Sequence, residues 1–343
     1  MVSDKQWMEL AIAEARKGIG LTAPNPAVGA VIVKDNKLLG SGWHRKAGKP
    51  HAEREAIADV IKKHGTKALI ESTIYVTLEP CSTRGKTPAC TDRILDAGIS
   101  RVVYGITDPN PDHAGKADNI LADAGVEIAK ISGSTAIDCS KLIRGFAKVQ
   151  QTGLPWVILK SAMSLDGRIT RPPGEGQWLT SPESRKVVQR LRFESDAVLT
   201  GGQTLRMDNP ALTIRDTSLP EKPQPWRMIV TRGQKSELPK DAQVFTDAHA
   251  ERTLVQENGD LEKSLRQLVA QGCQTVLVEA GGNLMGAFLD AGLADEMAIF
   301  IAPMITGGPD QAFASISKNM KLSQPDYERI GDDIFLRTCI SLT

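Results

Sequence analysis

The sequence predicts an α/β protein of two domains. Strand-like and helix-like segments alternate along most of its 343 residues, which is the pattern of sheets covered by helices. A chain of this length is long for a single hydrophobic core. Its character changes near residue 150, where a basic, helix-like segment is broken at Gly153 and Pro155 opens a fresh strand. We therefore expect one domain over residues 1–150 and a second over residues 151–343.

The overall composition narrows the possible partners. Forty-two basic and forty-one acidic residues leave a net charge of +1, and aromatic residues make up only 4% of the chain. Both values argue against a nucleic-acid partner. No apolar run approaches the ~20 residues that cross a bilayer, so no membrane partner is expected. Five irregularly spaced cysteines do not form a disulfide framework. These features predict a cytoplasmic protein with reduced thiols and a small-molecule substrate.

Capping residues and apolar spacing predict the elements of the first domain. Ser3 or Asp4 can cap a first helix that stops at Gly18, and Asp35-Asn36 forms a turn between two strands. Strands are expected at 27–33, 37–42, 72–77, 101–105 and 126–129, and further helices at 51–64, from Cys90 onward and at 116–124.

The second domain has a similar alternation but repeats no segment of the first. Ser181-Pro182 is a strong helix start, because a capping residue precedes proline at the first helical position. Strands are expected at 156–162, 197–200, 228–231 and 275–279, helices at 181–192, 261–270 and 283–291, and a polar loop or short helix at 204–210.

The clearest chemical signal combines His51-Ala52-Glu53 with Pro80-Cys81 and Cys90. A catalytic zinc keeps three protein ligands and leaves one position for a water molecule, which it acidifies. His51, Cys81 and Cys90 would be these ligands. Glu53 would then be free to move a proton between the water and a departing amine, as in zinc-dependent nucleobase deaminases. The usual C-x-x-C is stretched here to a gap of eight residues, so a loop must bulge between the two cysteines.

Other interpretations stay open at several of these positions. The zinc could be structural within a non-catalytic module, although such a site would need a fourth ligand nearby. Asn25, held between two prolines, could meet the edge of a heterocycle or simply form a turn. His44 could face the substrate or close a loop.

Two glycine turns in the second half could bind phosphate. Gly281-Gly282 separates a strand from a helix, and Gly201-Gly202 follows another strand. Backbone amides at such helix starts favour anions, and two turns of this kind could flank one dinucleotide. Arg192 could hold a phosphate through a bidentate contact, or could be a solvated surface residue. The same two interpretations apply to Arg215.

Short motifs in both halves match one family. The first half contains Pro24-Asn25-Pro26-Ala27-Val28-Gly29, His51-Ala52-Glu53, Thr77-Leu78-Glu79-Pro80-Cys81, Gly85-Lys86-Thr87-Pro88 before Cys90, and Asp108-Pro109-Asn110-Pro111. The second half contains Ser164-Leu165-Asp166-Gly167-Arg168, Gln177-Trp178-Leu179-Thr180-Ser181-Pro182, Asp208-Asn209-Pro210-Ala211-Leu212-Thr213 and Val278-Glu279-Ala280-Gly281-Gly282. With these motifs the chain resembles the bifunctional riboflavin-biosynthesis deaminase/reductases over nearly its whole length. The wide spacing of the cysteines is normal in that family. Ala23 and Thr83-Arg84 depart from it, since histidine is frequent at those positions.

The resemblance implies an N-terminal cytidine-deaminase-like α/β/α sandwich and a C-terminal dihydrofolate-reductase-like α/β domain. It implies Zn²⁺ in the first and NADPH in the second. The implied cofactor contacts are Ala162, Trp178, Thr204, Asp208, Gly281, Gly282, Asn283 and Leu284. The implied substrate contacts in the same domain are Gly176, Arg192, Leu212, Arg215 and Glu279.

The expected function is therefore a two-step enzyme acting on a pyrimidine ribosylamine phosphate. The resemblance implies deamination of the pyrimidine in the first domain and reduction of the ribosyl group to ribityl in the second. It also favours a homodimer, with a tetramer as the other possibility. The main alternative is a tRNA or nucleoside deaminase with a non-catalytic C-terminal binding domain. That alternative predicts C-x-x-C spacing and a basic face, and the sequence has neither.

Overall fold

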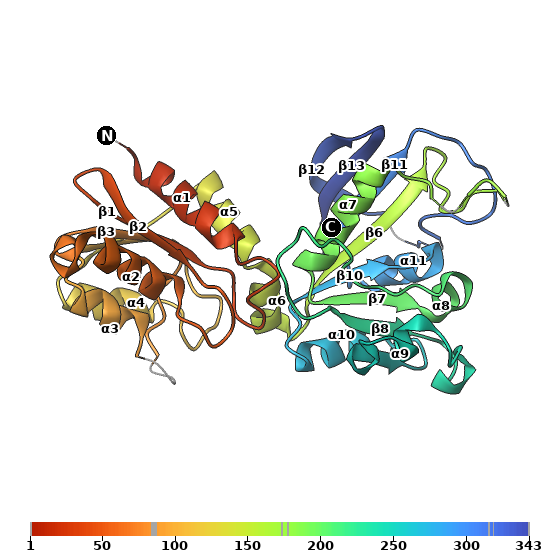
Figure 1. The fold of residues 1–343 in the computed structure, drawn as a ribbon, viewed down its shortest axis with the longest axis horizontal. Helices are drawn as coiled ribbons and strands as arrows, with labels where there is room; N and C mark the ends of the chain where they lie inside the picture. The colour runs from red at the N-terminus through yellow and green to blue at the C-terminus, as the bar shows by residue number, and fades with distance from the viewer. Residues whose placement is uncertain are drawn as a thin grey trace. The chain divides into compact units, whose positions relative to one another are not determined.

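The computed structural model describes residues 2–83, 88–172, 174–176, 178–314, 316–317 and 319–341. Its contacts divide the chain into two compact units, Met1–Thr152 and Gly153–Thr343, where the sequence analysis placed the division between residues 150 and 151. Both units appear in Figure 1, and each is described by itself. Arg84, Gly85, Lys86, Thr87 and Gln177, which belong to the motifs above, lie outside the described residues.

The N-terminal unit is built on a five-stranded sheet of order β2-β1-β3-β4-β5. β1 pairs antiparallel with β2 and β3, whereas β3, β4 and β5 are parallel. The strands are β1 (Gly29–Lys34), β2 (Lys37–Trp43), β3 (Thr73–Leu78), β4 (Arg101–Ile106) and β5 (Glu127–Lys130). The helices are α1 (Asp4–Arg16), α2 (Ala52–His64), η1 (Thr66–Leu69), α3 (Cys90–Asp96), α4 (Lys116–Asp123), α5 (Ser134–Leu142) and α6 (Arg144–Thr152).

Helices cover both faces of this sheet. Alternate residues of β1 face opposite sides, so that Ile32 packs in the core beneath α2, α3 and α4, while Val31 packs in the core beneath α1 and α5. Figure 1 shows α1 and α5 together on one side of the strands. The result is the α/β/α sandwich expected from the sequence.

Local signals fix the ends of these elements. Ser3 caps α1 in a capping box with Gln6, and the Asp35-Asn36 turn takes the two positive φ angles of 51° and 58° that a tight hairpin needs. His51 is the N-cap of α2, one position before the helix rather than inside its first turn.

The C-terminal unit is built on an eight-stranded sheet of order β12-β13-β11-β6-β10-β7-β8-β9. The six strands from β11 to β9 in that order are parallel, and β13 and β12 continue the sheet antiparallel. The strands are β6 (Trp156–Ser164), β7 (Ala197–Gly201), β8 (Trp226–Val230), β9 (Thr253–Gln256), β10 (Thr275–Glu279), β11 (Glu296–Ala302), β12 (Lys321–Ile330) and β13 (Asp333–Ser341). The helices are α7 (Pro182–Glu194), α8 (Gly202–Asp208), η2 (Lys235–Glu237), α9 (Gln243–Thr246), η3 (Ala250–Arg252), α10 (Leu261–Ala270) and α11 (Gly282–Asp290).

Three apolar clusters fill this second unit. α10 and α11 pack against one face of the sheet, where Phe288 is fully buried. α7 packs on the opposite face with Leu191, and α8 packs farther along that face with Leu205. Because strands buried on both faces read as continuous apolar runs, β6, β7, β8 and β10 were visible in the sequence.

The sequence analysis left several elements unidentified. It gave no strand for β9 or for β11, β12 and β13, and it expected no helix over α5. β12 alternates in a polar sequence and lies at the edge of the sheet, so it carries little apolar signal. Among the described residues, no helix is long and apolar enough to cross a membrane.

Candidate active sites

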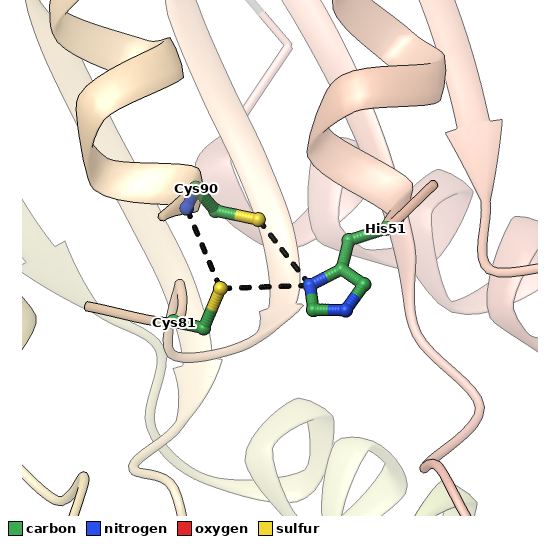
Figure 2. A group of neighbouring side chains, drawn as sticks. All are labelled: His51, Cys81 and Cys90. Atoms are coloured by element: carbon green, nitrogen blue, oxygen red, sulfur yellow. Dashed lines mark hydrogen bonds between the residues drawn. The ribbon is translucent and has the colours of Figure 1, made fainter. Parts of the chain in front are cut away.

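Three side chains of the N-terminal unit converge on one point. His51 precedes α2, Cys81 follows β3, and Cys90 begins α3. The Nδ1 atom of His51 lies 3.5 Å from the Sγ of Cys81 and 3.4 Å from the Sγ of Cys90. Figure 2 shows both sulfur atoms directed at that nitrogen. The three ligand atoms all lie within 4.8 Å of one another.

This geometry fits a zinc ion. Zn–S and Zn–N bonds of about 2.3 and 2.0 Å in a tetrahedron separate neighbouring ligand atoms by about 3.5 Å. Hydrogen bonding by Cys90 and His51 outweighs burial and lowers the pKa of Cys81 to about 4. Cys81 in turn raises the pKa of His51 to about 9. Without a metal, the Cys81 thiolate is thus paired with a protonated imidazole. A zinc ion would displace that proton and become the positive partner of the thiolate, because a ligating imidazole is neutral.

Glu53 lies in the first turn of α2, two residues after His51. Its side chain is 3% exposed, and burial raises the pKa of its carboxyl group. Among the described residues, the group of potential metal ligands at this site consists of His51, Cys81 and Cys90, without Glu53. Its buried carboxyl group is thus available to accept and release a proton.

Asn25 and His44 lie beside this ligand group. The Nδ1 of His44 is 3.0 Å from the carbonyl oxygen of Pro50, and its Nε2 is 3.0 Å from the Nδ2 of Asn25. Because a carbonyl only accepts, Nδ1 carries the proton and Nε2 accepts from the Asn25 amide. The His44 ring meets the His51 ring edge-on at 5.4 Å. Asn25 and His44 are therefore joined to each other next to the metal ligands.

The sequence analysis assigned no role to Glu79, which precedes Pro80-Cys81. Its buried carboxylate accepts backbone N–H groups from Asp108, Gly115 and Ala117 at 3.0–3.1 Å. Glu79 thereby fixes the loop that follows β4. A glutamate directly after an apolar strand could have signalled such a role, but its three partners are backbone atoms and leave no trace in the sequence.

The C-terminal unit contains a cleft of about 1320 Å³. It is lined at the carboxyl ends of β6, β10, β7 and β8, where open parallel sheets bind ligands. Its volume exceeds the roughly 300–1,000 Å³ of a pocket for one small molecule, so it has room for a dinucleotide and a second ligand.

Every residue of this unit for which the resemblance implied a contact lines that one cleft. These residues are Ala162, Gly176, Trp178, Arg192, Thr204, Asp208, Leu212, Arg215, Glu279, Gly281, Gly282, Asn283 and Leu284. Leu212 is 2% exposed and has a positive φ of 54°, a conformation unusual for a residue with a branched side chain.

A compact charge cluster lies at the floor of the cleft. Arg192 donates from Nε and Nη2 to the two carboxylate oxygens of Glu279 at 2.6 and 3.1 Å, and from Nη1 to the carbonyl of Thr213. The Nζ atom of Lys160 lies 3.8 Å from Glu279. Although burial alone would raise the pKa of Glu279, Arg192 and Lys160 outweigh it and lower that pKa to about 2. The sequence analysis missed Lys160, which is opposite Glu279 only through the parallel register of β6 and β10.

The two sites together define a class of protein, a zinc-dependent deaminase joined to a reductase. The family model "Cytidine and deoxycytidylate deaminase zinc-binding region" matches residues 1–106, and the model "RibD C-terminal domain" matches residues 155–336.

Whole-chain relatives give the family. The "Riboflavin biosynthesis protein RibD" of Escherichia coli is 35% identical over 98% of this chain and 99% of its own, and that of Aquifex aeolicus is 36% identical over 97% of both. Among solved structures, Acinetobacter baumannii RibD has a TM-score of 0.87 at 36% identity, covering 99% of both chains. A Thermotoga maritima structure has a TM-score of 0.86 at 33% identity, covering 98% of this chain and 99% of its own.

The chain belongs to the RibD family of bifunctional riboflavin-biosynthesis deaminases and reductases. Its N-terminal domain is of the zinc-binding deaminase type and its C-terminal domain of the NADPH-using reductase type. The family resemblance stated from the sequence is confirmed. The alternative was a deaminase with a non-catalytic C-terminal binding domain. It is wrong, because the C-terminal half is a reductase domain of the RibD type.

Proposed function

We propose that the chain catalyses two successive steps on one pyrimidine. The first is the hydrolytic deamination of 2,5-diamino-6-(5-phosphoribosylamino)pyrimidin-4-one in the N-terminal unit. The second is the NADPH-dependent reduction of the ribosyl group of 5-amino-6-(5-phosphoribosylamino)uracil in the C-terminal unit. The Thermotoga maritima relative is described as a diaminohydroxyphosphoribosylaminopyrimidine deaminase/5-amino-6-(5-phosphoribosylamino)uracil reductase. The observation that carries the proposal is the convergence of His51, Cys81 and Cys90 beside the buried Glu53.

In the deaminase unit, His51, Cys81 and Cys90 would hold the zinc. When bound, zinc supplies a Lewis acid that lowers the pKa of a water molecule to about 7. Glu53 is the catalytic residue. Its buried carboxyl group takes a proton from the attacking water and delivers it to the amino group that leaves as ammonia. Burial raises the pKa of Glu53, which favours its holding the proton between the two transfers.

Asn25 and His44 bind the pyrimidine. Since the Asn25 amide nitrogen donates to His44, its Oδ1 atom is left to accept from an N–H group of the ring. The pair thereby orients the amino-bearing carbon toward the water.

In the reductase unit, NADPH would, when bound, supply the hydride that the C1′ carbon of the ribosyl group takes up. The C1′–O4′ bond opens, so O4′ must receive a proton. Lys160 can donate it, because burial lowers the pKa of its ammonium group, while Glu279 stays ionised and holds Lys160 in place. Arg215 and Arg192 bind the 5′-phosphate, with Arg215 the stronger contact because Arg192 is already paired with Glu279. Gly176 and Leu212 contact the rest of the substrate.

The cofactor extends along the remainder of the cleft. Gly281, Gly282, Asn283 and Leu284 form the start of α11, whose backbone amides favour the pyrophosphate. Ala162, Trp178, Thr204 and Asp208 complete its contacts. A homodimer and a cytoplasmic location stay predictions, to be checked by sedimentation and by cell fractionation.

The decisive experiment uses the purified full-length chain. We expect one zinc per chain by mass spectrometry, ammonia release from the diaminopyrimidine substrate, and NADPH oxidation that begins only once deaminated product is present. A chain that releases ammonia at full rate after exhaustive chelation would refute the deaminase assignment. Failure to oxidise NADPH with supplied deaminated substrate would refute the reductase assignment separately.

A further inference from the structure

Residues 304–314, which follow β11, have no regular secondary structure and border the reductase cleft. We refer to residues 304–314 as the cleft segment. Pro309, Asp310, Gln311 and Ala314 of this segment line the cleft. Such a segment must be held by contacts outside itself, and the structure shows where these contacts are.

The first anchor is the turn Ser164-Leu165-Asp166-Gly167-Arg168, which the sequence analysis singled out without giving it a role. The Asp166 carboxylate accepts from the backbone N–H groups of Thr306 at 3.2 Å and Gly307 at 2.9 Å. Its Oδ1 also accepts from the Ser164 hydroxyl at 2.5 Å, and this hydroxyl lies 3.2 Å from that of Thr306. The carboxylate is thus the centre of the attachment.

Backbone pairing extends this anchor along the cleft segment. Leu165 donates to the carbonyl of Met304, Ile169 to that of Asp310, and Ala312 to that of Gly167, at 2.8–3.1 Å. Arg168 and Gln311 form an isolated antiparallel bridge. The turn and the cleft segment are therefore joined at several points along their length.

The second anchor is the first turn of α11. A Cβ atom at Gly282 would collide with the carbonyl oxygen of Gln311, and one at Gly286 would collide with that of Ala314. Gly281, by contrast, has nothing within 4 Å of such an atom. The cleft segment closes the Gly282 side of the helix start and leaves the Gly281 side open, so it forms one wall of the place where the cofactor phosphates bind.

We propose that Asp166 is a positioning residue for the cofactor, which fastens the cleft segment as a wall beside the start of α11. Asp166 is absent from the lining of the cleft and acts through Thr306 and Gly307. The inference rests on the proposed binding of NADPH in this cleft. It gives a role to an acidic residue that does not itself line the cleft.

The test is NADPH binding by full-length Asp166→Asn, followed by quenching of protein fluorescence. An asparagine has one acceptor oxygen and no charge, and its amide group opposes one of the two backbone N–H groups. Losing one charge-assisted hydrogen bond predicts an about tenfold rise in the Kd for NADPH. We expect kcat at saturating NADPH to stay within about twofold, because the segment is ordered again once cofactor is bound.

Three further variants make the outcome specific. Asp326→Asn, on the exposed edge strand β12, removes the same charge from the same unit and should leave the Kd unchanged. Asp166→Glu, which keeps the carboxylate, should recover most of the affinity. Thr306→Ala removes only the contact with the Ser164 hydroxyl and should raise the Kd about threefold, so the test survives if Asp166→Asn fails to fold.

An unchanged Kd in folded Asp166→Asn and Thr306→Ala would overturn the positioning role. A fall in kcat or in melting temperature at unchanged Kd would also overturn it, since it would indicate a purely structural turn. If the wild-type protein itself does not bind NADPH, the proposed reductase function is refuted, and the positioning role of Asp166 is refuted with it. Ammonia release by each variant reports on the other unit of the same chain.

Discussion

The two candidate sites are built in opposite ways. The metal binding and proton transfer of the deaminase site depend on four side chains from two short stretches, and the ligand atoms converge within 4.8 Å. The reductase cleft occupies about 1320 Å³ and draws on the ends of four parallel strands and on the cleft segment. A metal ion restricts ligand type and distance so strongly that few residues suffice. A dinucleotide instead needs a long surface, to which each residue contributes a little.

The sharpest test of this contrast removes the single acid/base group. Glu53→Gln should lower the rate of ammonia release by about 10³-fold, because Glu53 is the buried carboxyl group beside the ligands to which the proton transfer is assigned. Reduction of supplied deaminated substrate should stay unchanged. Glu55→Gln is the matched control. Glu55 lies two residues after Glu53 in α2 and is paired with Arg45 at the surface, so this variant should retain ammonia release. Equal loss of both activities in Glu53→Gln would show that the two sites are not independent.

Removing one ligand should abolish the metal site as a whole. Cys90→Ser exchanges a thiolate for a hydroxyl and should weaken zinc binding by more than about 100-fold, measured by competition with a chelating dye. Cys339→Ser, at an exposed position of β13, should leave zinc content intact. Retention of one tightly bound zinc by Cys90→Ser would mean that the ion has another ligand set.

The reductase cleft also has one place where a few side chains matter strongly, the charge cluster on its floor. Glu279→Gln leaves Arg192 and Lys160 buried without a counter-charge and should lower the free energy of unfolding of this unit by about 3 kcal/mol. NADPH oxidation should fall as well. Glu262→Gln breaks the exposed pair with Arg266 and should change stability by less than about 0.5 kcal/mol. Urea unfolding would distinguish the two, and similar small effects would show that the cluster is solvated.

The smallest expected effect concerns a surface pair of the deaminase unit. Hydrogen bonds from Arg101 hold the pKa of Asp4 below its ordinary value. Because the folded-state pKa is depressed, the pair stabilises the fold above about pH 4 and loses that contribution as the pH falls further. Asp4→Asn should cost about 1 kcal/mol at pH 6, since the Asp4 side chain is 41% exposed.

The measurement for this pair is urea unfolding followed by tryptophan fluorescence, to which Trp7 on the same helix contributes. The difference between wild type and Asp4→Asn should shrink steadily as the pH falls below about 4. A difference that persists there would assign the effect to the bond with Tyr75 rather than to the charge.

The contrast between the sites also explains what the sequence could reveal. Residue type and spacing were enough to predict the chemistry of the deaminase site. The structure brings the predicted residues together, namely His51, Glu53, Cys81 and Cys90. The general layout of β6, β7, β8 and β10 followed from apolar runs. The cleft residues were named only through resemblance to a family, because nothing local marks Ala162 or Leu212 as a contact.

Lys160 and Glu79 show why the remainder was missed. Lys160 interrupts an apolar strand, and its partner lies on a strand over a hundred residues later. Glu79 binds backbone amides, which every sequence offers. Both roles depend on tertiary pairing, and residue spacing along one segment does not encode it. The polar edge strand β12 escaped detection for a related reason, since it is held by its pairing with β13 and has no apolar pattern of its own.

The register that sets Lys160 opposite Glu279 has a consequence for anyone who reshapes this enzyme. Their side-by-side placement on parallel strands means that neither position can be optimised alone. In a variant library that randomises only one of them, most members would contain a buried charge without its partner. Joint randomisation of positions 160 and 279, with Arg192 kept, is the design that can reach new substrates.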